Sequence, residues 1–135
     1  MCLYYMFHRK SMNDLEKDPE KYIEKLFSFL ENEGFSKSHR QVNSDNCFSY
    51  VKNDFYIIID YDCFMKMRYV NFSVYYKVWD KNPLINHLFI EDERYKERFQ
   101  RYDDLNCKEK IDLVAEYLSE RIEDVMNANI TNYRY

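Results

Sequence analysis

Two aspartates are the residues of this sequence most suited to chemistry. Asp60 and Asp62 are two positions apart in the segment IDYD, so they lie on the same side of an extended strand. Paired carboxylates can hold a divalent cation or divide acid and base roles between them. No further ligand follows at a metal-binding spacing, and aspartate is common where a strand runs into solvent. A small metal-dependent enzyme or module using this pair is therefore an alternative hypothesis, and we predict no metal or cofactor.

A cysteine nucleophile with a histidine base is the second chemistry to consider. His39 could serve Cys47 or Cys63, because such partners meet in space rather than in sequence. No small-residue turn presents either thiol, and the cysteine spacing matches no zinc site. His8 and His87 stand on other segments. We therefore expect packed structural thiols, surface histidines and no catalytic residue.

Aromatic residues are the most numerous side chains in this sequence that could contact a protein partner. The chain has fourteen Tyr, ten Phe and one Trp, and they concentrate between residues 48 and 79. Tyrosine is frequent at protein interfaces, because a rigid ring buries much area at little entropic cost. The alternative is that these tyrosines pair with one another across strands and only stabilise a sheet. We predict a partner-binding set on the sheet and on a following charged helix: Tyr50, Tyr56, Tyr69, Tyr75, Tyr95, Phe99 and Tyr102.

Composition excludes several other functions. Gly34 is the single glycine among 135 residues, so no glycine-rich phosphate-binding loop can form. The net charge of -4 argues against non-specific binding of nucleic acid, which requires a basic face. No apolar run approaches the roughly 20 residues that cross a bilayer, and the apolar start is short for a secretory signal. We expect a cytoplasmic protein that binds neither membrane nor nucleic acid.

A helix over 18–33 is clearly delimited. Asp18 suits the N-cap, and Pro19 suits the first helical position, where its missing N–H costs nothing. An apolar stripe follows at helical spacing. Gly34 then suits a left-handed C-terminal residue, which lets Phe35 fold back in a Schellman motif.

Strands follow this helix. Residues 46–52 and 54–62 pair around Asn53-Asp54 as a hairpin, and 35–42 also has an extended pattern. In a long strand over 66–79, Val70 and Val74 face the core, whereas Tyr69 and Tyr75 face the other side. One sheet face is thus covered and the other is at least partly wet.

Two helical segments complete the chain. A charged helix is expected over 91–102, and its aromatic stripe suits packing or docking. Asn106 and Glu109 form a capping box for a final helix. Helices on one face of an antiparallel sheet of three or four strands give an α+β two-layer sandwich. We predict one domain over 1–135, with 1–13 and 127–135 loosely ordered.

The segments ENEGF at residues 31–35 and YVNFSV at residues 69–74, with a closing helix, give the chain a resemblance to small bacterial α+β families. Some members of these families are immunity proteins that block one cognate toxin, and no functional residue carries over. The resemblance implies a non-enzymatic inhibitor that acts by protein–protein contact. A phage or viral host-interaction protein is a further alternative, and the sequence leaves the oligomeric state open.

Overall fold

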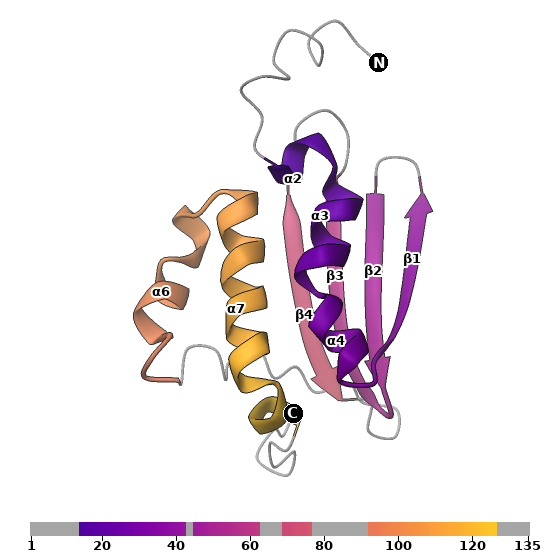
Figure 1. Ribbon diagram of the computed structural model, residues 1–135. Coiled ribbons are helices and arrows are strands. Elements are labelled where there is room, and N and C mark those ends of the chain that lie inside the picture. The colour runs from indigo at the N-terminus through magenta and orange to yellow at the C-terminus, as the bar shows by residue number, and fades with distance from the viewer. Residues whose placement is uncertain (1–13, 43–44, 63–68, 77–91, 127–135) are drawn as a thin grey trace, which may run out of the picture.

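The computed structural model describes residues 14–42, 45–62, 69–76 and 92–126. The N- and C-terminal segments expected to be loosely ordered lie outside these ranges. The fold is α+β, with helices on one side of a four-stranded antiparallel sheet, which confirms the predicted class (Figure 1). The elements in chain order are α2 (Asp14–Lys17), α3 (Pro19–Leu26), α4 (Ser28–Asn32), β1 (Ser36–Val42), β2 (Asp45–Lys52), β3 (Phe55–Asp62), β4 (Val70–Tyr76), α6 (Lys96–Gln100), η2 (Tyr102–Asp104) and α7 (Cys107–Met126).

The first predicted helix forms as α3 and α4, with a break at Phe27. The carboxylate of Asp18 accepts from the Lys21 amide at 3.1 Å, which confirms the N-cap. At the break, the Ser28 hydroxyl donates to the Lys25 carbonyl at 2.9 Å. Side-chain bonds of this kind compete with the helical ladder and bend helices. The sequence pattern predicted neither this break nor the preceding short helix α2.

Gly34 ends α4 as predicted. Its φ is +95°, and its amide donates to the Glu31 carbonyl at 3.0 Å. The Phe35 amide donates to the Leu30 carbonyl at 2.9 Å. These two bonds make a Schellman motif, which turns the chain from the helical layer into β1.

The strands form a meander in the order β1-β2-β3-β4, and every neighbouring pair is antiparallel. In the predicted hairpin, Lys52 pairs with Phe55, and Asn53 makes the turn with a φ of +54°. The extended pattern after α4 is the fourth strand, β1. The long strand expected over 66–79 is described as β4. Tyr69 lies immediately before this strand, and 66–68 and 77–79 lie outside the described residues.

The core lies between the sheet and the helical layer. Phe27 reaches it from the break between α3 and α4, Leu30 reaches it from α4, and Val114 and Leu118 reach it from α7. In Figure 1 these three helices lie on the same side of the sheet. The strand side chains that meet them are buried: Phe48, Tyr50, Phe55, Ile57, Ile59, Tyr61, Val70 and Val74.

The final helix begins at the predicted capping box. The Glu109 amide donates to the Asn106 side chain at 2.8 Å, and the Asn106 amide donates to the Glu109 carboxylate at 3.1 Å. The charged helix expected over 91–102 is shorter, as α6 and η2. Both lie along the outer flank of α7, away from the sheet (Figure 1).

Candidate functional site

No described helix covers the second face of the sheet, which we call the open face. Side chains alternate along each strand, so the residues between the buried ones point to the open face. The register of the strands aligns these residues in rows across the sheet. These side chains are half-buried or exposed, in contrast to the buried side chains under the helices. The open face comprises Ser38, Arg40, Cys47, Ser49, Val51, Tyr56, Ile58, Asp60, Asn71, Ser73 and Tyr75.

A stacked tyrosine pair dominates one end of the open face. Tyr56 of β3 pairs with Tyr75 of β4, and their ring centroids lie 5.0 Å apart with the planes 3° from parallel. Val51 pairs with Tyr56 from the other side. Burial, and then the neighbouring Tyr56, raise the pKa of Tyr75. The pair is a rigid, half-buried aromatic surface with its hydroxyls as polar handles.

The next row of the open face has small side chains on both sides of a single isoleucine. Ile58 lies between Ser49 and Ser73, which are its partners on the two adjacent strands. The three side chains are half-buried, and small neighbours leave the isoleucine accessible from above. The half-buried Ile58, with a serine on each side, is therefore the apolar centre of this face.

A polar row follows, in which Asp60 lies between Cys47 and Asn71. Burial is the main cause that raises the pKa of the Cys47 thiol, and its Sγ lies 3.8 Å from the Ser49 hydroxyl. A raised pKa disfavours the thiolate that a nucleophile requires. The described cysteines, Cys47 and Cys107, are reduced thiols outside any disulfide bond, as expected.

Tyr69 lies at the rim of the open face, immediately before β4. It is half-buried, and its hydroxyl donates to the carboxylate of Asp45. This bond is the first cause, and burial the second, that raises the pKa of Tyr69 to about 12. Two of the predicted contact residues on the sheet, Tyr56 and Tyr75, are thus brought together, and Tyr69 lies near the opposite end.

Tyr50 requires a correction. Its side chain is fully buried under the helical layer, with its ring 6.1 Å from that of Phe27. It pairs across strands with Ile57, so it points away from Tyr56. The Asn53-Asp54 turn could have predicted the face on which Tyr50 lies, because a turn fixes the register of a hairpin and with it the face of each residue. Tyr50 is a core residue and cannot contact a partner.

The aromatic stripe predicted for the charged helix over 91–102 also requires a correction. Tyr95 and Phe99 are buried against α7, where their rings meet Tyr117 edge-on at 5.0 and 5.6 Å. Tyr102 is half-buried and stacks on Phe99 at 6.2 Å, with the Lys110 ammonium 5.3 Å above its ring. Packing therefore uses Tyr95 and Phe99, and we remove these two residues from the predicted contact set, whereas Tyr102 stays a prediction.

The described residues of the two catalytic hypotheses are not arranged for catalysis. His39 stacks on Phe48 at 4.3 Å on the covered face, whereas Cys47 projects from the open face, so the two do not pair. Asp60 and Asp62 share a side of β3, but Asp62 is fully buried. Within the described ranges, no group of three or more His, Cys, Asp or Glu side chains could hold a metal ion. Cys63, His8 and His87 lie outside these ranges.

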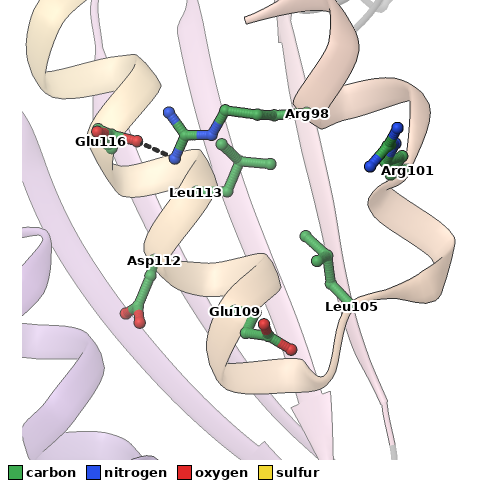
Figure 2. Close-up of a pocket in the computed structure, with 7 residues that line it drawn as sticks. All are labelled: Arg98, Arg101, Leu105, Glu109, Asp112, Leu113 and Glu116. Carbon is green, nitrogen blue, oxygen red and sulfur yellow. Dashed lines mark hydrogen bonds and ion pairs between the residues drawn. The ribbon is translucent and has the colours of Figure 1, made fainter.

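A groove between α6 and α7 has a volume of about 610 Å³ (Figure 2). Leu105 and Leu113 provide its apolar lining. Its charged residues have partners within the protein: Arg98 with Glu116, Arg101 with Glu97, Asp112 with Lys108, and Glu109 with the Asn106 amide. Because these charges are already compensated, the groove ranks below the open face as a recognition site.

Comparison with known proteins gives no relative: no family model, no curated protein and no solved structure matches this chain. Among the described helices, none combines the length and apolar character needed to span a membrane. The candidate site therefore stands on the geometry of the open face.

Proposed function

We propose that this protein is a non-enzymatic binding module that contacts another protein through its open face. The Tyr56–Tyr75 pair carries this proposal, because two parallel, stacked rings lie on a sheet face that no described helix covers. Tyrosine is enriched at interface hot spots, where surrounding residues that contribute little energy exclude water from it. The resemblance noted in the sequence makes inhibition of a toxin or another enzyme, in the cytoplasm, the most concrete form of this function.

A protein partner suits this surface better than single-stranded nucleic acid. Aromatic platforms that stack bases place Lys and Arg around the rings, where they contact phosphates. On the open face, Arg40 and Asp60 lie in the same row and offset each other in charge. Asp45, which is exposed, lies beyond that row and has no cation opposite it on β3. A face without excess positive charge does not attract a phosphate backbone.

The test begins with co-purification of the full chain with the product of the adjacent gene, followed by calorimetric titration of the pair. Tyr56→Ala combined with Tyr75→Ala should weaken binding by about 2 kcal/mol or more, roughly thirtyfold in Kd. Ser73→Arg should weaken it comparably, because a long charged side chain would stand at the centre of the face. Circular dichroism should show that both variants keep the native fold.

A matched control lies on the other side of the molecule. Lys17→Ala combined with Lys21→Ala changes exposed side chains of the helical layer and should leave Kd unchanged. Equal weakening by the control would contradict the assignment to the open face. Unchanged affinity of the folded tyrosine variant would contradict it as well.

A further inference from the structure

The outer edge of β1 is a second surface built for contact, distinct from the open face. No described strand pairs with this edge, and six of the seven residues of β1 are exposed. The strand pairs one-to-one with β2 along its whole length and contains neither a bulge nor a proline. Bulges, prolines, very short strands and charged side chains, lysine above all, are the usual means by which sheets blunt an edge. In Figure 1 β1 stands clear of the helical layer.

The hairpin registers show which backbone groups of β1 point outward. Lys52 pairs with Phe55 across a two-residue turn, so this pair is hydrogen-bonded, and bonded pairs alternate along antiparallel strands. Lys52 and every second residue before it in β2 direct their backbone groups to β3. The residues between them, which include Ser49 and Cys47, therefore bond to β1. The β1 residues opposite them, Ser38 and Arg40, therefore bond inward. The amides and carbonyls of the alternate residues, Lys37, His39 and Gln41, point outward.

The side chains of Lys37 and His39 do not block this edge, because both turn toward the helical layer. The Lys37 ammonium lies 3.4 Å from Glu24 and 3.8 Å from Glu31, on the helical layer. The His39 ring lies over Phe48, with Nδ1 3.4 Å from Glu20 and Nε2 2.7 Å from the Asn46 amide oxygen. Both side chains are engaged within the protein, which leaves the backbone groups between them accessible.

We propose that β1 pairs antiparallel with β1 of a second copy, about a two-fold axis at His39, to form one continuous eight-stranded sheet. In this register the outward groups match and the whole of β1 is paired, with Lys37 opposite Gln41 and Ser38 opposite Arg40. Registers centred on Lys37 or Arg40 would place like charges opposite each other, which is unfavourable. The strand is thus self-complementary in its longest register, as a two-fold interface requires.

This dimer goes beyond the proposed function and does not depend on it. The paired edge leaves the open face of each copy uncovered and sets the two faces side by side in one sheet. Loss of partner binding in the tyrosine variant therefore says nothing about the dimer, and the two proposals can fail separately.

Sedimentation velocity of the full chain over a wide concentration range tests the dimer. Gln41→Pro should give a monomer with an unchanged fold, because it removes an outward donor and proline is tolerated at a strand edge. Gln41→Ala, which keeps that donor, should remain dimeric. A monomeric wild type at millimolar concentration, or a dimeric Gln41→Pro variant, would overturn the proposal.

A charge pair tests the register and does not depend on the proline variant. Gln41→Lys places a lysine opposite Lys37 twice in each dimer and should raise the dimer Kd by about tenfold, whereas Gln41→Glu should lower it. Amide exchange gives a positional readout: in the dimer, the amides of residues 37, 39 and 41 should be protected together with those of 38 and 40. Equal Kd values for the two variants, or fast exchange at 37, 39 and 41 in a dimer, would overturn the proposed interface.

Discussion

At the scale of single residues, burial separates the tyrosines that we propose as partner contacts from the tyrosines that pack in the core. Tyr50 and Tyr75 look alike in the sequence, yet one is fully buried and the other is half-buried on the open face. The hydroxyl of Tyr50 has no hydrogen-bond partner among the described residues. An unpaired buried hydroxyl costs free energy, so this residue combines a favourable ring with an unfavourable polar atom.

Tyr50→Phe should leave the free energy of unfolding unchanged or raise it by about 1 kcal/mol, because it removes a desolvated hydroxyl and keeps the ring. Tyr50→Ala should lower it by about 3–5 kcal/mol, because it empties a core position. Urea unfolding measures both. A loss of more than about 1 kcal/mol for the phenylalanine variant would mean that the hydroxyl is satisfied in the folded protein.

At the scale of elements, the terminal signals of helices were the most reliable part of the sequence. Asp18, Gly34 and the Asn106–Glu109 box act at the predicted positions, because capping depends on a few adjacent residues. The turn at residue 34 is the sharpest case. A Cβ there would lie 3.5 Å from the Lys52 side chain, so space is adequate and only the backbone conformation demands glycine.

Gly34→Ala should therefore lower the free energy of unfolding by about 1–2 kcal/mol, the cost of a left-handed residue with a Cβ. Gly34→Asn should cost less, because asparagine tolerates this region. Urea unfolding of both variants makes the comparison. Equal losses in the two variants would point to a steric cause at the Lys52 contact rather than to backbone strain.

The fold was more predictable than the candidate site, for physical reasons. Alternation in β4 identified its covered and open sides, because valines occupy one of them. In β2 both sides mix polar and apolar residues, so pattern alone left Tyr50 ambiguous, although the hairpin register resolves it. The stripe of α6 has the same spacing whether it packs on α7 or docks a partner, so only tertiary structure separates the two. Ile58 and its serine neighbours were missed because they form a patch only across strands.

At the scale of the whole molecule, buried tyrosines link stability to alkaline pH. Burial is the main cause that raises the pKa of Tyr50 and of the half-buried Tyr102. Burial is also the main cause that raises the pKa of Tyr95, to about 12. An unfolded tyrosine has a pKa of about 10. Above that pH the unfolded chain releases protons that the folded protein retains, so the free energy of unfolding falls as pH rises.

We therefore expect stability to be constant with respect to these groups below pH 10 and to fall above it, by roughly 1.4 kcal/mol per pH unit for each tyrosine that stays protonated. Urea unfolding from pH 8 to about pH 11.5, just below the raised pKa values, measures the slope. Tyr50→Phe should reduce that slope, because it removes one of the linked groups. A flat profile above pH 10 would contradict the linkage.

The meander also has a kinetic consequence. Each strand pairs with its neighbour in the chain, so the contacts of the sheet close short loops and carry little entropic penalty. Packing of α7 against β4 and α3, in contrast, joins segments far apart in the chain. The sheet therefore suits early assembly around the turn at Asn53, and docking of α7 suits the later, slower step. Substitutions in the hairpin should then act mainly on the rate of folding, and substitutions in α7 mainly on the rate of unfolding.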